Sequence, residues 1–229
     1  MTDLCDPLLP ELIHCQCCPR LVDYLATLPP KRGRTREEYW NRPVPGFGDV
    51  NARIWLVGLA PGAHGANRTG RPFTGDGAGD FMYPLLHQAG FSNQPDSVRC
   101  DDALTLNDLY ISNSVKCVPP GNKPLASEFH QCRDYLVREW HQLEQVKVIL
   151  TLGRDAFISV LHLLKSQGLI TRLADYPFGH DVCYTLDNGQ QLLACYHTSR
   201  YNVQTGRITP ASFLQVLRHA RQLAGADRG

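Results

Sequence analysis

Residues 54–76, IWLVGLAPGAHGANRTGRPFTGD, decide the fold. Residues 54–58 form a short apolar run that ends at a glycine, which is typical of a strand buried on both faces of a parallel sheet. The nineteen residues from Gly58 to Asp76 contain five glycines, which permit close backbone approach and positive φ angles. Because ligands of parallel sheets bind beyond the carboxyl ends of the strands, this loop is a candidate binding site.

Strands and helices alternate along the rest of the chain. Strands are expected at residues 109–115, 146–152, 183–186 and 191–196, and helices at residues 80–89, 127–143, 155–165 and 209–223. Ser127 is the expected N-cap of the second of these helices and Thr209 that of the last, while the turn signal at residues 187–189 joins the final two strands as a hairpin. The alternation predicts a three-layer α/β sandwich with a central, mostly parallel sheet.

Length and composition fit one folded α/β domain, or at most two small ones. The chain has 229 residues, of which 43% are hydrophobic and 20% are charged, so long disordered segments are not expected. Its net charge of +1 gives no sign of a nucleic-acid partner, and any such surface must be a local patch. No apolar run approaches the length of a membrane span, and the N-terminus does not resemble a secretory signal, so the expected compartment is the cytoplasm.

The loop after residues 54–58 carries two arginines suited to phosphate, Arg68 and Arg71. It is not a P-loop, because no Gly-Lys-Ser/Thr follows, and it lacks the dinucleotide-binding fingerprint. The alternative is an ordinary strand-to-helix connection with solvated arginines. Residues 29–49, rich in proline, glycine and charge, are expected to form a surface connection from an N-terminal helical piece to the main domain.

Nine cysteines are many for a chain whose thiols stay reduced, and their odd number argues against a complete disulfide framework. Cys15 and Cys18 have the spacing of two ligands of one metal, while Cys117 and Cys132 lie on a loop and on the helix that follows it. Four thiolates suit either zinc or a [4Fe–4S] cluster, and the spacing does not choose between them. Cys183 and Cys195 lie on the expected hairpin and are expected to be small apolar residues. No role is assigned to Cys5 and Cys100.

Several segments together resemble the type b (family 5) uracil-DNA glycosylases, in the right order from about Cys15 to Phe213. The segments are GLAPGAHGANRTGRPFTGD at 58–76, YWNRPVPGFGD at 39–49, GDFMYPLLHQAGF at 79–91, NSVKCVPPGN at 113–122 and HTSRYNVQTGR at 197–207. The resemblance implies one uracil-DNA glycosylase domain over residues 1–229, with a cluster-binding N-terminal segment at residues 1–50. It also implies a monofunctional hydrolase that starts base excision repair by removing uracil, and further deaminated bases such as hypoxanthine and xanthine, from DNA.

The same resemblance implies a [4Fe–4S] cluster held by Cys15, Cys18, Cys117 and Cys132, with a structural task. Cys17 lies inside the first pair and is the main rival ligand. The cluster would tie the N-terminal segment to the loop that begins at Asn113.

A base must leave the duplex before its glycosidic bond can be hydrolysed, so a pocket with stacking and polar contacts is needed. The resemblance places Ala60, Gly62, Phe73, Asn113 and His197 around that base. Phe73 would stack on it, the Asn113 amide would read its edge, and His197 would donate to the negative charge that builds on the leaving base. The alternatives are a core phenylalanine, a turn-forming asparagine and a packed histidine.

Ala60 stands where other uracil-glycosylase families carry a carboxylate or amide that orients water. The route is therefore either largely dissociative or uses a relocated polar group, and Asn67, Asp76 and Asp80 are unranked candidates for that group. A less crowded first motif also indicates a tolerant pocket. Thr198 departs from the proline that often follows the family histidine.

The expected partner is DNA that contains uracil or other deaminated bases, with no membrane contact and a monomeric state. The expected DNA-binding side chains lie in the first and last motifs: Arg68, Arg71, Arg200, Tyr201 and Arg207. An exposed basic loop without function is the alternative for the last three. Two other functions compete, a catalytically inactive iron–sulfur DNA-binding protein on the same fold and a hydrolase of free nucleosides or nucleotides. Retention of Asn113 and His197 opposes the first, and the long basic loops oppose the second.

Overall fold

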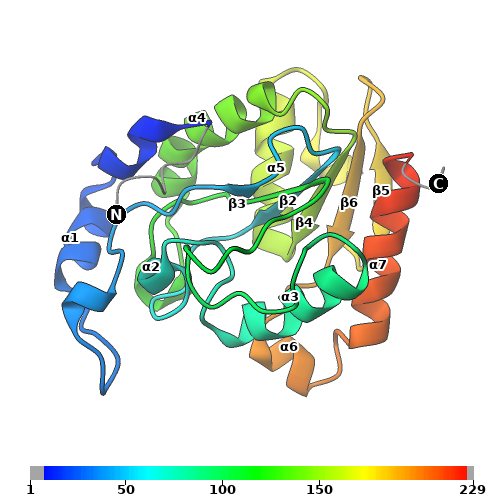
Figure 1. Ribbon diagram of the computed structural model, residues 1–229. Helices are drawn as coiled ribbons and strands as arrows, with labels where there is room; N and C mark the ends of the chain where they lie inside the picture. Colours follow the sequence, from blue (N-terminus) through cyan, green and yellow to red (C-terminus); the bar gives the residue numbers. More distant parts are fainter. Residues whose placement is uncertain (1–7, 226–229) are drawn as a thin grey trace.

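A computed structural model describes residues 8–225 of the chain, and its centre is a six-stranded sheet (Figure 1). The strand order is β1-β3-β2-β4-β6-β5, in which β3, β2, β4 and β6 are parallel and the two edge strands are antiparallel to their neighbours. The strands are β1 (Phe47–Gly48), β2 (Ile54–Gly58), β3 (Leu109–Asn113), β4 (Val148–Leu152), β5 (Val182–Thr185) and β6 (Gln191–Cys195).

Helices cover both faces of the sheet and make a three-layer sandwich. The α-helices are α1 (Pro19–Thr27), α2 (Ala66–Thr69), α3 (Gly77–Gln88), α4 (Ala126–Gln142), α5 (Arg154–Ser166), α6 (Arg200–Gln204) and α7 (Pro210–Leu223). Short 3₁₀ helices are η1 (Pro10–His14), η2 (Arg36–Glu38), η3 (Pro120–Asn122) and η4 (Leu173–Asp175). Buried residues of α3 and α7 pack on one face, and those of α4 and α5 on the other.

The alternation of side chains along β2 explains why its whole sequence is apolar. Ile54 and Leu56 enter the core beneath α3 and α7, whereas Trp55 and Val57 enter the core beneath α4 and α5. Successive residues of a strand point to opposite faces, so a central strand with helices on both sides has no polar face. The predicted fold class is therefore confirmed.

The N-terminal segment packs against a third, smaller core at one end of the sheet. Leu21, Leu25 and Leu28, from α1 and the residue that ends it, contact a buried group that includes Val115 and Val118. Three cysteines belong to the same core, namely Cys18, Cys117 and Cys132. This packing places the beginning of the chain against the loop that follows β3.

Most predicted elements are present, with corrections at their ends. β3 ends at Asn113 instead of residue 115, and α3 begins at Gly77 because Asp76 caps it with hydrogen bonds from the Ala78 and Gly79 amides. Ser127 is not an N-cap, because α4 begins one residue before it and Leu125 occupies the cap position. The predicted hairpin and the Thr209 cap of α7 are confirmed.

The expected surface connection at residues 29–49 is only partly on the surface. Residues 43–46 are buried, and residues 47–48 form β1 at the edge of the sheet beside β3. A two-residue strand without an alternating pattern gives no periodic signal, which is why composition alone indicated a loop. Within residues 8–225, no helix combines the length and apolarity that crossing a membrane requires.

Candidate active site

A pocket of about 490 Å³ lies at the carboxyl ends of β2, β3, β4 and β6. The loop after β2, the start of α3, the start of α5 and the beginning of α6 contribute its walls. Ala60, Gly62, Phe73, Asn113 and His197 all line it, so the structure brings together the five residues expected around the base. Its volume is in the range of small-molecule sites.

Phe73 adopts a backbone conformation that is unusual for a bulky residue. Its φ is +53°, and its side chain is 7% exposed at the pocket wall. Such left-handed geometry costs free energy and persists where the surroundings impose it. Gly79 in α3 permits it, because an added Cβ there would lie 1.6 Å from the Phe73 carbonyl oxygen. The aromatic ring is thus fixed in place beside the His197 ring, with 6.1 Å between their centroids.

Asn113 is the last residue of β3, and it is 3% exposed. Gly58, the last residue of β2, pairs with it in register. A Cβ at Gly58 would lie 2.4 Å from the Asn113 Oδ1 and 2.5 Å from the Phe73 Cζ. The absence of a side chain at this glycine is therefore what lets the amide and the ring approach each other at the floor of the pocket.

His197 follows β6 and faces the pocket with both ring nitrogens free of hydrogen bonds to the described part of the chain. The Asn202 amide donates to the His197 backbone carbonyl over 2.8 Å, which holds the loop to α6. Burial lowers the pKa of His197 below its ordinary value of 6.5, and the nearby Asp76 carboxylate opposes that change only in part. The imidazole is therefore neutral at neutral pH and can donate one N–H to a ligand.

Asp76 is the carboxylate that the structure places at the pocket. Its Oδ1 accepts hydrogen bonds from the amides of Ala78 and Gly79, at 3.0 and 3.3 Å. Its Oδ2 lies against Gly62 and Gly65, where an added Cβ would come within 2.8 and 2.2 Å. One oxygen is thus used to begin α3, and the other remains available at the wall of the pocket.

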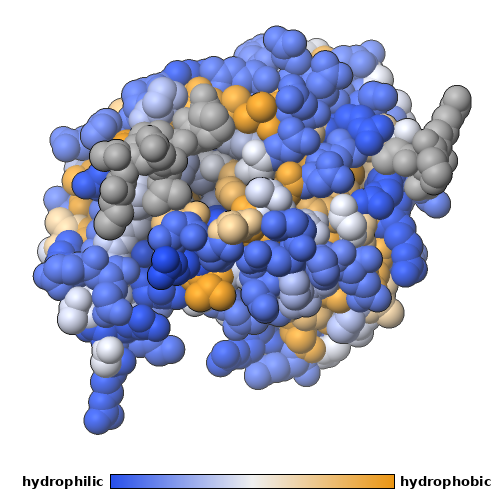
Figure 2. Space-filling view, viewed as in Figure 1, coloured by the Kyte–Doolittle hydropathy of each residue, from blue (hydrophilic) through white to orange (hydrophobic). Residues whose placement is uncertain are grey.

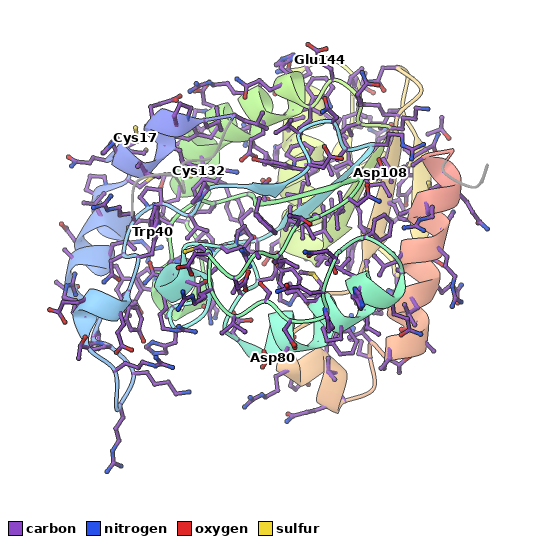
Figure 3. All side chains as sticks on the ribbon, viewed as in Figure 1. Cys17, Trp40, Asp80, Asp108, Cys132 and Glu144 are labelled. Carbon is purple, nitrogen blue, oxygen red and sulfur yellow. The ribbon has the colours of Figure 1, made fainter. Side chains whose placement is uncertain are left out.

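The other two candidates for the water-orienting group lie elsewhere, so the sequence-based expectation for them is corrected. Asn67 is fully buried, and its amide nitrogen donates to the Asn41 side chain over 3.0 Å. It does not line the pocket, although its neighbour Ala66 does. Asp80 is exposed on the first turn of α3, at the lower edge of the molecule in Figure 3, and does not line the pocket either.

The expectation that Arg71 binds DNA is also corrected, because the residue cannot present its charge to DNA from its position. Its side chain is 3% exposed, donates to Asp102 over 2.7 Å, and lies over the Phe47 ring. It ties the first motif to the loop before β3. Arg68 is half-buried, and its Nε donates to the His64 carbonyl over 3.1 Å.

The last motif forms α6, which stands beside the pocket opening. Arg200 is exposed and lines the pocket, while Tyr201 is 71% exposed. The Arg207 guanidinium lies 4.4 Å from the centroid of the Tyr196 ring. Arg200 and Tyr201 are thus exposed beside the pocket opening, whereas Arg207 contacts an aromatic ring.

Sequence reasoning missed one wall of the pocket, the segment that joins β4 to α5. Gly153, Arg154, Asp155 and Ala156 line it, and no side chain caps the amino end of α5. The signal was present in the sequence as a buried strand followed by glycine and a helix, but it carries no distinctive motif.

Five cysteines line one small cavity between the N-terminal segment, the loop after β3 and α4: Cys15, Cys17, Cys18, Cys117 and Cys132. A hydrogen bond from the Cys132 thiol lowers the pKa of Cys18 to about 7, and burial raises the pKa of Cys117 to about 12. Figure 3 shows Cys17 and Cys132 at the same end of the molecule. Within residues 8–225, no three histidine, cysteine or acidic side chains are already grouped in the arrangement of a metal site.

Lys116 adjoins this cavity and is fully paired. Its Nζ lies 2.5 Å from Glu139 of α4, both side chains are buried, and Glu139 also accepts from the Ser112 hydroxyl over 2.9 Å. A buried ammonium in an ion pair is not available as a nucleophile. Lys116, beside the cysteine cavity, therefore has a structural role.

Comparisons with known proteins agree with this geometry. Residues 45–221 match the family described as the uracil DNA glycosylase superfamily. The chain is 50% identical over 215 residues to the type-5 uracil-DNA glycosylase of Thermus thermophilus, covering 93% of this chain and 95% of that protein. It is 44% identical to the type-5 enzyme of Mycobacterium leprae over 94% of this chain and 93% of the relative. For the type-5 enzyme of Pyrobaculum aerophilum the identity is 42%, over 96% and 93% respectively.

Proposed function

The chain belongs to the uracil-DNA glycosylase superfamily and is accordingly a hydrolase of N-glycosidic bonds, and we propose that it removes uracil from DNA. The observation that supports this most strongly is the convergence of Phe73, Asn113, His197 and Asp76 on one pocket from four separate segments of the chain. A nucleotide rotated out of the duplex would insert its base there. The Phe73 ring would stack on the base, and the Asn113 amide would pair with its polar edge.

Hydrolysis of the glycosidic bond requires stabilisation of the departing base and delivery of water. The bond from the sugar C1′ to the base nitrogen breaks with its electron pair on the base, and the neutral His197 imidazole donates a hydrogen bond to the anion that forms. Water adds to the oxocarbenium-like sugar and transfers a proton to the Asp76 carboxylate, whose free Oδ2 also orients it. Ala60 contributes no polar atom, so the carboxylate that other families carry at that point is supplied from the start of α3.

Other deaminated bases are further proposed substrates. Ala60 and Gly62 leave their part of the pocket wall without large side chains, and the pocket volume of about 490 Å³ suits a purine as well as a pyrimidine. Hypoxanthine and xanthine present the same kind of polar edge to an amide that can both donate and accept.

One assay tests the function directly. Duplex oligonucleotides with a single uracil, hypoxanthine or xanthine are incubated with the protein and then treated with alkali, which cleaves the strand wherever a base has been removed. Strand cleavage at uracil is expected, and a duplex with thymine at that position is the control. Failure to cleave at any of the three bases would favour an inactive DNA-binding protein on the same fold.

The absence of lyase activity is the next expectation. A lyase forms a Schiff base between an amine and the sugar, and Lys116, the lysine within the motif at residues 113–122, is buried in its ion pair with Glu139. Borohydride added during excision should therefore trap no covalent protein–DNA adduct. An adduct that disappears in Lys116→Ala would contradict the monofunctional assignment.

We infer that the cysteine cavity holds a [4Fe–4S] cluster. Five thiols at one cavity fit such a group, since Cys ligands are its usual donors, and the buried or half-buried Cys15, Cys18, Cys117 and Cys132 are the four that we assign. Cys17 is exposed and is left as the spare thiol. When bound, the cluster supplies a covalent link between the N-terminal segment, the loop after β3 and α4.

Loss of a ligand should therefore remove the iron and destabilise the protein. Anaerobically purified protein should be brown and contain iron, and Cys117→Ala should contain much less and melt at a lower temperature. Cys183→Ala is the matched control, because Cys183 is a half-buried cysteine of β5 outside this cavity. Stoichiometric zinc without iron would contradict the proposed cluster, and full iron retention in Cys117→Ala would contradict the assignment of Cys117 as a ligand.

A further inference from the structure

A basic turn projects from the segment between α1 and β1. Residues 31–34, Lys-Arg-Gly-Arg, form a β-turn that the Arg34 amide closes by donating to the Lys31 carbonyl over 2.9 Å. Gly33 has a φ of +84°, as the third position of a type II turn requires, and all four residues are exposed. Figure 2 shows this projection as a hydrophilic extension at the lower left of the molecule.

The base of the turn is fixed by several hydrogen bonds. The Arg36 guanidinium donates to the Leu25 and Leu28 carbonyls at the end of α1, over 3.0 and 3.2 Å. The Lys31 amide donates to the Tyr39 hydroxyl over 3.0 Å. The turn is thus a defined projection, and within residues 8–225 the side chains of Lys31 and Arg32 at its tip make no ion pair that would explain their charge.

The same anchors connect the turn to the loop that forms the pocket. The Tyr39 hydroxyl lies 2.9 Å from the His64 Nδ1, and the Trp40 amide donates to the Arg68 carbonyl over 2.9 Å. The Trp40 ring packs against Gly70, where a Cβ would lie 3.0 Å from it. The turn therefore has a fixed position relative to α2.

The turn and α6 lie on different sides of the pocket opening. Ala66 of α2 lines the pocket on the side to which the turn is attached, whereas Ser199 and Arg200 line it at the start of α6. Figure 1 shows the projecting segment and α6 on the same, lower side of the molecule. A duplex bound across the opening by α6 would continue toward the turn.

The charge at the tip is free to act on a partner. Arg34 shares its charge with Glu38, at 2.8 Å, but within residues 8–225 neither Lys31 nor Arg32 has an acidic partner. Because the whole chain carries a net charge of only +1, attraction to a polyanion depends on such local, unpaired cations.

We propose that Lys31 and Arg32 contact the DNA backbone on one side of the damaged nucleotide, as a second contact site separate from α6. The proposal rests on the proposed function, because it takes DNA as the substrate. Contacts to phosphate position a protein without reading sequence, so the turn would add affinity for duplex of any sequence. The chemistry at the flipped base would not depend on it.

The test compares Lys31→Gln/Arg32→Gln with the wild-type protein on a duplex that carries a non-cleavable uracil analogue. Removal of two phosphate contacts should lower the slope of log binding constant against log salt concentration by about 1.8. Lys147→Gln/Lys165→Gln is the matched control. Both of its lysines are exposed, one just before β4 and the other near the end of α5, which is the end of the sheet opposite the pocket. The control should retain the wild-type slope.

Two further measurements locate the contact. Single-turnover excision at saturating enzyme should be the same in the turn variant and the wild type. Shortening the duplex on one side of the uracil should abolish the difference in affinity, whereas shortening it on the other side should not. An unchanged salt slope in the turn variant would overturn the inference while excision of uracil remained intact. A wild-type protein that excised nothing would overturn the proposed function instead, and the slope comparison would still test the turn.

Discussion

His197→Ala should slow single-turnover excision of uracil by about 10²–10³-fold, which is the usual effect of losing one hydrogen-bond donor to a developing anion. The imidazole is neutral, faces the pocket and has no competing partner for its ring nitrogens within the described residues. Its bond to the base strengthens as negative charge builds, so it stabilises the transition state more than the bound substrate. Affinity for DNA with a non-cleavable uracil analogue should change little.

The pH dependence gives a second readout of the same residue. Because burial lowers the pKa of His197 below its ordinary value, lowering the pH from 8 to 7 leaves the imidazole mostly neutral, and its contribution to the rate should change little over that range. The rate must be measured under single-turnover conditions, since slow product release would conceal the chemical step. A His197→Ala variant that excises uracil at nearly the wild-type rate would mean that this histidine is structural.

Asp76→Asn should slow excision by about 10²-fold, at the lower end of the usual effect of a general base, because departure of the base precedes most of the bonding to water. The substitution is conservative for the fold. Asparagine caps helices as well as aspartate does, so the bonds from the Ala78 and Gly79 amides and the melting temperature should be retained. At the pocket wall the second carboxylate oxygen is replaced by an NH2 group, which removes both the negative charge and the acceptor.

Asp80→Asn is the matched control for this prediction. It removes one carboxylate from the same helix, only four residues further along the chain, but on an exposed face outside the pocket. Its rate should equal that of the wild type. Equal rates in all three proteins would remove Asp76 from the mechanism, and a loss confined to Asp80→Asn would reverse the assignment that the geometry gives.

The comparison of Asp76 and Asp80 shows which property of the site the sequence could not predict, namely the direction of each side chain. Both residues lie in one glycine-rich motif, and nothing in their spacing ranks them. The N-cap geometry distinguishes the two side chains. Asp76 has extended backbone angles that fold its carboxylate back over Gly62 and Gly65. Asp80 lies within the helix and points to solvent. Side-chain direction depends on where a helix begins, and that boundary was expected several residues later.

Arg71 shows that the sequence also does not reveal which charged side chains are paired. An arginine in a glycine-rich loop has the composition of a phosphate site, but its partner Asp102 is 31 residues away in the sequence. The residues near Arg71 in the sequence do not predict that ion pair. Conversely, Lys31 and Arg32 lie in a segment whose composition indicated only a connection, and their significance depends on the anchors at Tyr39 and Trp40 that bring the turn beside α2.

The sequence by itself determined the elements whose signal is local. Apolar runs such as residues 54–58 must be buried on both faces, the turn at residues 187–189 must close a hairpin, and the order of motifs fixed the family, because these depend on periodicity and on residues close in the chain. Only the tertiary structure decided which polar groups face the pocket, which are consumed by partners, and which cysteines share one cavity. Those properties depend on contacts between segments that are distant in the sequence. They also depend on helix boundaries, because a shift of a single boundary redirects a side chain from the pocket to the solvent.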